Sequence, residues 1–434
     1  MADKNSFAPD PPMGWNSWDV YGAAVTEELL LQNTDYMAAN LKEYGWQYIV
    51  CDIQWYCPTA NSSHYQDFAD LCVDEYGRCI PAPNRFPSAK GGEGFKRIAD
   101  YVHDKGLKFG IHIMRGIPRQ AVHDNCPIKG TGYTARQIAH PASICSWNTD
   151  MYGIDANKPG AQEYYNSILE LYAYWGVDFI KVDDISVKTS RFGGPEYGAE
   201  EVELIRRAID QCGRPIVLSL SPGPAFIEKA KHLQAHANMW RITGDFWDEW
   251  SAVLETFRRC NIWAPFVKDG SYPDCDMLPL GHISIIGCEH GVSERMTRFS
   301  KNEQITVLSL WSIFRSPLML GCELTDLDDW TKSLITNRGV IALNKRSRNA
   351  HQIKCSDTEI VWIADDSEGS WQYLAMFNIA GWDEEISLDR LDIGPKASYK
   401  LYDIWDQREY GSLDSRVAIS IPSHGAKLFR ITSN

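Results

Sequence analysis

The strongest constraint on the fold is a short apolar segment that recurs eight times before residue 345. Several of these segments are apolar at nearly every position, as in YIVCDIQW, LKFGIHIM and PIVLSL. Runs of this kind are typical of parallel strands that are buried on both faces. The candidate strands are Met13–Trp18, Tyr48–Trp55, Leu107–Met114, Asp178–Asp183, Pro215–Leu220, Met239–Asp245, Ser271–Met277 and Pro317–Leu320.

Helical periodicity fills the intervals between these strands. The predicted helices are Glu27–Tyr44, Gly94–Lys105, Ala161–Trp175, Glu200–Cys212, Ala225–Ala237, Trp247–Cys260 and Glu303–Arg315. Gly106 and Gly176 each stand between a predicted helix and a predicted strand, where a glycine often ends a helix. This alternation predicts a (β/α)₈ barrel over residues 1–345. A doubly wound sheet is the alternative, but no GxGxxG follows the first strand, so its dinucleotide-binding form has no support.

The pattern changes after residue 345. Short alternating runs such as TEIVWIAD, SWQYLAMFNIA and SYKLYDIW are separated by turn residues. Alternation with a period of two is typical of strands with one buried face. We therefore predict a second domain over residues 346–434, a small antiparallel β-sandwich.

Charge and composition exclude several classes of protein. The 434 residues include 43 basic and 57 acidic ones, a formal charge of −14 that disfavours nucleic acid as a partner. The most apolar stretch, residues 305–321, is interrupted by Arg315 and three serines, so we expect no membrane span. The N-terminal residues lack an apolar leader, and the twelve cysteines form no CxxC pair, so we expect a cytoplasmic protein with reduced thiols. Nothing in the sequence indicates the oligomeric state.

Polar residues collect where the predicted barrel strands end. In barrels of this type, the active site lies at the C-terminal ends of the strands. The residues there are Asn16–Asp19, Asp52, Gln54, Trp55, His112, Arg115, Lys181, Asp183, Asp184, Ser219, Ser221, Arg241, Asp245, Asp274 and Asp276. Carboxylates and cations bind sugar hydroxyls, and aromatic rings pack against sugar C–H faces. Two opposed carboxylates also supply a nucleophile and a general acid for cleavage of a glycosidic bond.

Each of these residues also has a purely structural interpretation. An aspartate after a strand is often a helix N-cap, and Trp18 and Trp55 would serve equally as core aromatics. Lys181 precedes Asp183 by two residues, so both point into the barrel or neither does. His232 and His236 are four residues apart, but no Glu follows the first His, so we interpret them as a solvated helix face. We expect neither a metal nor an organic cofactor.

Taken together, these strand ends resemble glycoside hydrolase family 27, the α-galactosidase and α-N-acetylgalactosaminidase family. The resemblance covers nearly the whole chain. PPMGWNSW resembles the family's opening motif, FIKVDD its nucleophile strand, WRITGDFWDEW its acid/base strand and PDCDMLPLG its seventh-strand signature. It implies that Asp183 is the nucleophile and Asp245 the acid/base. It also implies that the sugar-contacting positions are Trp18, Asp52, Lys181, Arg241, Asp276 and Met277.

The sequence departs from the family at positions that bear on the sugar. Members usually have two adjacent acids on the second strand, which hold the 4- and 6-hydroxyls, and here the second is Ile53. His112 replaces a tyrosine on the third strand, and Ser221 stands where α-galactosidases place a glutamate against the 2-hydroxyl. The segment 115–160 is longer than in typical members, and we expect it to cover the site.

These observations predict a retaining exo-α-glycosidase that acts on terminal α-galactosides or α-N-acetylgalactosaminides. His112 and Ser221 complete the predicted substrate-binding set. Because of Ile53, another α-linked sugar such as an arabinopyranoside or a glucoside is the alternative substrate. A catalytically silent sugar-binding protein is a further alternative, which the presence of both Asp183 and Asp245 disfavours.

Overall fold

The structure is a computed structural model that describes residues 3–188, 194–286, 293–369 and 371–433. Within these ranges, eight strands form one parallel sheet in the order β10-β9-β8-β7-β3-β2-β1-β13. They are β1 (Met13–Asn16), β2 (Tyr48–Cys51), β3 (Lys108–Met114), β7 (Phe179–Asp183), β8 (Val217–Leu220), β9 (Met239–Arg241), β10 (Tyr272–Asp274) and β13 (Leu318–Leu320). A parallel bridge between Leu278 and Leu320 joins the two ends of this sheet. The predicted (β/α)₈ barrel is confirmed.

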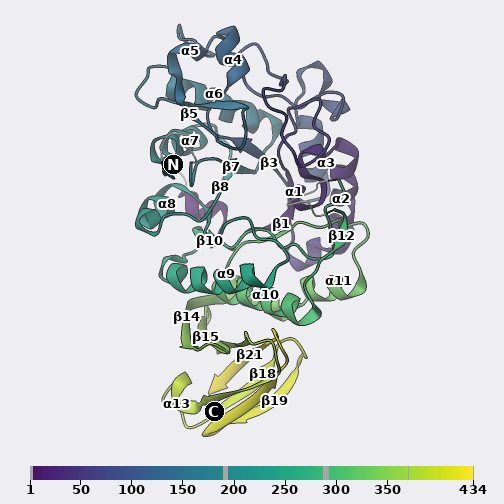
Figure 1. Ribbon diagram of the computed structural model, residues 1–434, viewed down its shortest axis with the longest axis vertical. Helices are drawn as coiled ribbons and strands as arrows, with labels where there is room; N and C mark the ends of the chain where they lie inside the picture. The colour runs from purple at the N-terminus through teal and green to yellow at the C-terminus, as the bar shows by residue number, and fades with distance from the viewer. Residues whose placement is uncertain (1–2, 189–193, 287–292, 370, 434) are drawn as a thin grey trace.

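Helices surround the sheet (Figure 1). They are α1 (Trp18–Tyr21), α2 (Glu27–Asn40), α3 (Lys96–Asp104), α6 (Ala161–Trp175), α7 (Ala199–Gln211), α8 (Ala230–His236), α9 (Trp250–Trp263), α10 (Lys301–Phe314), α11 (Asp329–Ile335) and α12 (Arg338–Arg346). Gly106 and Gly176 follow α3 and α6 with φ of +72° and +86°, a left-handed conformation that favours glycine and ends a helix. A capping box between Ser300 and Glu303 begins α10.

The interior of the barrel explains how the strands position polar groups. Apolar side chains from strands on opposite sides of the barrel meet in one buried cluster. The cluster includes Tyr48, Val50, Phe179, Val217, Met239, Tyr272 and Met319. Side chains two residues apart along a strand point to the same side. Lys181 therefore stands above Phe179, Arg241 above Met239 and Asp274 above Tyr272. The apolar layer closes the barrel below, and the polar residues occupy its C-terminal end.

The segment 115–160 forms a small subdomain after β3. It contains β4 (Ile117–Pro118), α4 (Arg119–Asp124), α5 (Ala135–Ile138), β5 (Ala139–Ile144) and β6 (Met151–Ile154), with the three strands in one antiparallel sheet. Its Asp150 accepts hydrogen bonds from Gln54 (2.7 Å) and Tyr56 (2.9 Å), so the subdomain is attached to the loop that follows β2. A further two-stranded sheet, β11 (His282–Ile283) and β12 (Arg295–Met296), lies in the loop after β10.

The C-terminal part is an antiparallel sandwich. A six-stranded sheet, β14-β15-β16-β21-β18-β19, faces the pair β17-β20 across a buried apolar cluster. The elements are β14 (Ser347–Cys355), β15 (Glu359–Asp366), β16 (Gln372–Asn378), β17 (Glu384–Asp389), α13 (Arg390–Ile393), β18 (Tyr399–Asp403), β19 (Arg408–Leu413), β20 (Arg416–Ile421) and β21 (Ala426–Ser433). Helix α10 of the barrel packs against β14, β16 and β21 (Figure 1). The predicted sandwich is confirmed.

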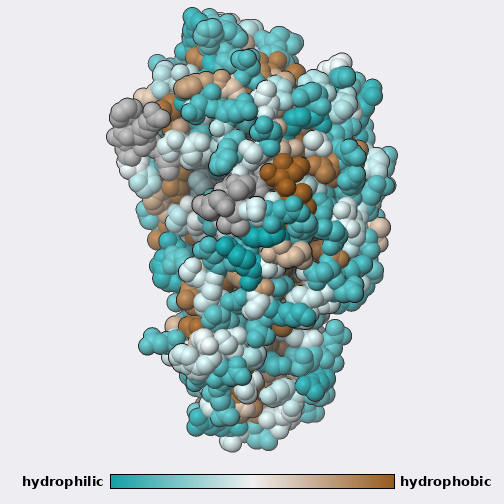
Figure 2. Space-filling view, turned by 45° about the vertical axis from the view of Figure 1, so that its right-hand side comes forward, coloured by the Kyte–Doolittle hydropathy of each residue, from teal (hydrophilic) through white to brown (hydrophobic). Residues whose placement is uncertain are grey.

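The surface in Figure 2 is mostly hydrophilic, with apolar residues in small separate groups. Within the described ranges, no helix has both the length and the apolar character that crossing a membrane requires.

Candidate active site

A cavity of about 380 Å³ opens at the C-terminal ends of the barrel strands. Both predicted catalytic residues, Asp183 and Asp245, line it. So do seven of the eight predicted substrate-binding residues: Trp18, Asp52, Lys181, Ser221, Arg241, Asp276 and Met277. The barrel therefore brings together residues that lie up to 259 positions apart in the chain.

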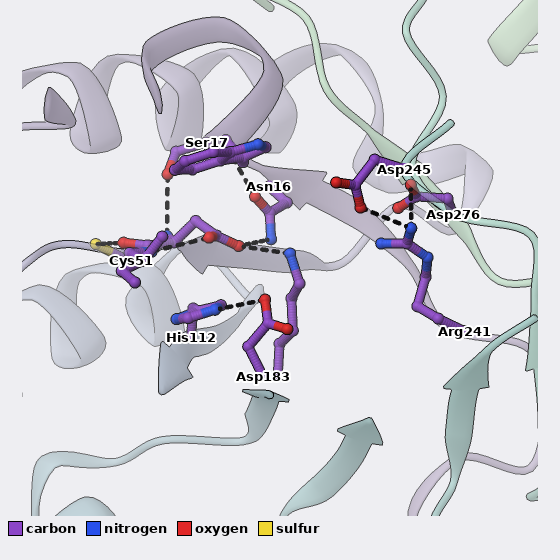
Figure 3. Close-up of polar contacts among 12 residues, drawn as sticks. Asn16, Ser17, Cys51, His112, Asp183, Arg241, Asp245 and Asp276 are labelled. Atoms are coloured by element: carbon purple, nitrogen blue, oxygen red, sulfur yellow. Dashed lines mark hydrogen bonds and ion pairs between the residues drawn. The ribbon is translucent and has the colours of Figure 1, made fainter. Parts of the chain in front are cut away.

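Asp183 is held in the ionised form at the end of β7. Its Oδ2 lies 3.1 Å from His112 Nε2 (Figure 3), and its Oδ1 accepts a hydrogen bond from the Asp184 N–H at 2.9 Å. Burial alone would raise the pKa of Asp183, but the His112 hydrogen bond and the charges of His112 and Lys181 outweigh it and lower the pKa to about 2. A carboxylate in this state is a nucleophile at every pH near neutrality.

His112 takes a different position from the one expected. Its side chain is only 1% exposed and is not among the cavity-lining residues, so it faces Asp183 rather than the cavity. His112 is paired in register with Lys181 on β7, so its side chain lies on the same side of the sheet as those of Lys181 and Asp183. The geometry gives His112 a contact with the candidate nucleophile and none with the cavity.

Asp52 and Lys181 form a buried pair on the same wall. Asp52 Oδ2 lies 3.1 Å from Lys181 Nζ and accepts a 2.6 Å hydrogen bond from Asn16, while its Oδ1 accepts one from the Ile53 N–H. Burial disfavours charge on Asp52, but Lys181, His112 and these hydrogen bonds together lower its pKa. An ionised carboxylate and an ammonium group thus stand side by side, one to accept from and one to donate to sugar hydroxyls.

Asp245 and Asp276 share one arginine on the other wall (Figure 3). Arg241 Nη2 lies 3.0 Å from Asp245 and 2.9 Å from Asp276, and Asp276 also accepts from the Phe246 N–H. Burial raises the pKa of Asp276 to about 7, because the Asp245 and Asp274 charges add to the effect of burial and Arg241 offsets only part of it. Asp276 therefore keeps its proton to a much higher pH than an exposed aspartate does.

The remaining lining residues were not among the predicted catalytic and substrate-binding residues, although the sequence analysis noted Asp19 at a strand end and Ile53 as a departure from the family. They are Asp19, Ile53, Tyr65, Trp147, Pro222, Phe246 and Trp247. Burial, with the Asp276 charge next in size, raises the pKa of Asp19 well above its usual range. In the sequence, Asp19 directly follows Trp18 at the end of a predicted strand, and this position could have identified it as a site residue. Ala225, near Ser221 in sequence, is not among the lining residues.

Aromatic rings from three separate segments form the rim. The Trp18 and Tyr65 rings stack at 5.9 Å, and Tyr65 meets Trp147 at 5.6 Å. Trp147 belongs to the 115–160 subdomain, which contributes to the cavity as the sequence predicted. Tyr65 and Trp147 lie in loops without strand periodicity, so no sequence pattern identified them.

The site is typical of a glycoside hydrolase. It combines opposed carboxylates, paired cations and an aromatic rim at the end of a (β/α)₈ barrel. The family model described as "Alpha galactosidase A" matches residues 10–158 and 150–346, and that of the "Alpha galactosidase C-terminal beta sandwich domain" matches 356–431. The chain belongs to this family, glycoside hydrolase family 27.

Three relatives indicate the range of activities in its neighbourhood. A family 27 β-L-arabinopyranosidase of Geobacillus stearothermophilus is 52% identical, with a TM-score of 0.96 over 99% of this chain and 98% of that one. A second structure of that enzyme holds arabinose. A putative α-N-acetylgalactosaminidase of Bacillus halodurans is 50% identical, with a TM-score of 0.88 over 98% and 97% of the two chains. An α-galactosidase of Cyamopsis tetragonoloba is 26% identical over 99% of this chain and 88% of its own length.

Proposed function

We propose that this glycosidase releases terminal β-L-arabinopyranosyl residues with retention of configuration. The observation that carries the proposal is Ile53 in the cavity wall, beside Asp52. β-L-Arabinopyranose is α-D-galactopyranose without the C6 hydroxymethyl group. An acidic side chain that binds the 6-hydroxyl has no partner in a sugar that lacks C6. An apolar side chain at the same position occupies the space that the C6 hydroxymethyl group of galactose would take.

The energetic argument disfavours galactose as the best substrate. Ile53 is only 1% exposed, and it presents an apolar side chain to the cavity in place of a hydrogen-bonding group. A galactosyl 6-hydroxyl placed there would lose its water without gaining a partner, at a cost of about 1–3 kcal/mol. The 52% identical arabinopyranosidase agrees with this choice of substrate.

The proposed mechanism uses two displacements. An Asp183 oxygen attacks the anomeric carbon while Asp245 gives its proton to the departing aglycone oxygen. Asp245 then takes a proton from water, and the hydroxyl adds to the anomeric carbon as the bond to Asp183 breaks. Two inversions restore the starting configuration. His112 holds Asp183 ionised, and Asp52 and Lys181 bind sugar hydroxyls.

Hydrolysis of α-N-acetylgalactosaminides is the second candidate, and Ser221 favours it. A serine beside C2 leaves room that a glutamate would fill, and the relative at 50% identity carries that name. The methyl group of an acetamido substituent would also need an apolar wall. Ala225 is buried but does not line the cavity, so it does not supply that wall.

A comparison of three nitrophenyl glycosides tests the proposal. We expect kcat/KM to be highest on the β-L-arabinopyranoside, lower on the α-D-galactopyranoside and lowest on the α-N-acetylgalactosaminide. A preference for the acetamido sugar would contradict the proposal and support the second candidate. No activity on any of the three, from a folded protein, would favour a silent sugar-binding protein.

A further inference from the structure

Two neighbouring helices on the outside of the barrel bring three ligand atoms together, away from the residues that line the sugar cavity. His232 and His236 stand on α8, and Glu203 stands on α7. One donor atom from each lies within 4.8 Å of the other two. The two helices are adjacent in the outer ring (Figure 1), and none of the three residues lines the cavity that holds Asp183.

Hydrogen bonds orient both imidazole rings. His236 Nδ1 lies 2.9 Å from the His232 carbonyl oxygen, which can only accept, so the proton of neutral His236 is on Nδ1. The lone pair of His236 is therefore on Nε2. His232 Nδ1 lies 2.8 Å from the Tyr197 hydroxyl, and its Nε2 is 3.3 Å from Glu203 Oε1. A partner on the second ring nitrogen is the usual support of a metal-binding histidine.

The spacing suits a small tetrahedral cation. Zinc bonds of about 2.0–2.1 Å to nitrogen and oxygen place the ligand atoms of a tetrahedron roughly 3.3–3.4 Å apart. The 3.3 Å between His232 and Glu203 already has this value. The ligand atom of His236 lies within 4.8 Å of the other two, so the three atoms are close enough for a modest side-chain adjustment to place them around one ion.

The residue types of the cluster also suit a cation. Two imidazoles and one carboxylate are a common ligand set of zinc.

We propose that Glu203, His232 and His236 bind one Zn²⁺ that joins α7 to α8, with water completing the coordination. The sequence analysis interpreted the two histidines as a solvated face because no glutamate follows the first. The third ligand instead comes from another helix, 29 residues earlier. The cation is outside the cavity and takes no part in the proposed glycoside chemistry.

Zinc binding to the chelator-treated full-length chain tests this proposal. We expect one Zn²⁺ per chain after dialysis, and we expect His232→Ala and His236→Ala each to weaken binding by at least about 10-fold. Tyr197→Phe removes only the partner of His232 Nδ1 and should weaken binding by about 10-fold. His123→Ala removes an exposed histidine of α4 and is the matched control, with binding unchanged. Co²⁺ in place of Zn²⁺ should give the visible absorption of a tetrahedral site.

Two results would overturn the proposal. One is the absence of stoichiometric zinc from the chelator-treated chain at micromolar free metal. The other is binding that survives His236→Ala, which would place the ion elsewhere, for example at the exposed Cys355. Unchanged hydrolysis of a nitrophenyl glycoside reports that each variant is folded. Glu203→Gln keeps the side-chain shape and decides the matter if a histidine variant fails to fold.

Discussion

Replacement of Ile53 by aspartate should shift the enzyme from arabinopyranosides towards galactosides. Ile53→Asp places a carboxylate where the family usually holds the 6-hydroxyl. A hydrogen bond between a hydroxyl and a charged group contributes about 1.5–3 kcal/mol. At about 1.4 kcal/mol for each factor of ten, kcat/KM on the α-D-galactopyranoside should rise by roughly 10–150-fold.

The same change should harm the arabinopyranoside reaction. It removes the buried apolar contact of a side chain that is only 1% exposed, which is worth about 1.5–3 kcal/mol. It also places a second carboxylate beside Asp52, with no hydroxyl to compensate when the sugar lacks C6. We therefore expect kcat/KM on the β-L-arabinopyranoside to fall and the melting temperature to decrease.

The assay measures kcat/KM on both nitrophenyl glycosides for the wild type and three variants. Ile53→Leu keeps an apolar side chain of the same size and should leave the ratio of the two values within a few-fold. Ile53→Asn offers only a neutral hydrogen bond of about 0.5–1.5 kcal/mol, so its ratio should lie between those of the wild type and Ile53→Asp. A folded Ile53→Asp enzyme with the wild-type ratio would refute the role of this residue.

Three other changes test the remaining parts of the site. Asp245→Ala should reduce kcat/KM by about 10²–10⁴-fold on alkyl glycosides but far less on a dinitrophenyl glycoside, which needs no proton, and equal losses would contradict the acid role. His112→Asn removes the main hydrogen bond that lowers the pKa of Asp183 from its usual range to about 2. Since Asp183 must be ionised, activity is lost as pH falls through its pKa, so the acid limb of the kcat/KM profile should move to higher pH, and an unmoved limb would count against this role. Trp147→Ala removes part of the aromatic rim and should raise KM by about 2–10-fold with little change in kcat; an unchanged KM would place the sugar elsewhere.

The sequence predicted the barrel because its central strands are buried on both faces. Each of the eight predicted strands contains an observed one, and the predicted helix Ala161–Trp175 matches α6 at both ends. Four of the predicted strands end at the observed residue, and the other four were too long at their C-terminal ends, as in Met239–Asp245, where β9 ends at Arg241. The excess residues include Trp18, Asp52, Asp245 and Asp276 of the site, whereas Lys181, Asp183 and Arg241 still belong to paired strands.

The rest of the site depends on packing that no local pattern records. Tyr65 and Trp147 meet across 82 residues of chain, and each stands in a loop. His112 has the alternation of an inward-facing residue, yet it is covered by Asp183 from the neighbouring strand. Glu203 approaches His232 only because two helices are neighbours in the outer ring.

The most direct test of the proposed mechanism is to trap the sugar on the enzyme. A 2-deoxy-2-fluoro-β-L-arabinopyranosyl fluoride should form a stable glycosyl ester with the nucleophile. The ester increases the mass of the intact chain by one fluorosugar. Trypsin cleaves after Lys181 and Lys188 and after Arg241 and Arg258, so Asp183 and Asp245 fall in different peptides. We predict that the label is in peptide 182–188 and that fragmentation places it on Asp183. A label in peptide 242–258, or turnover of the unmodified substrate without any trapped ester, would contradict the account.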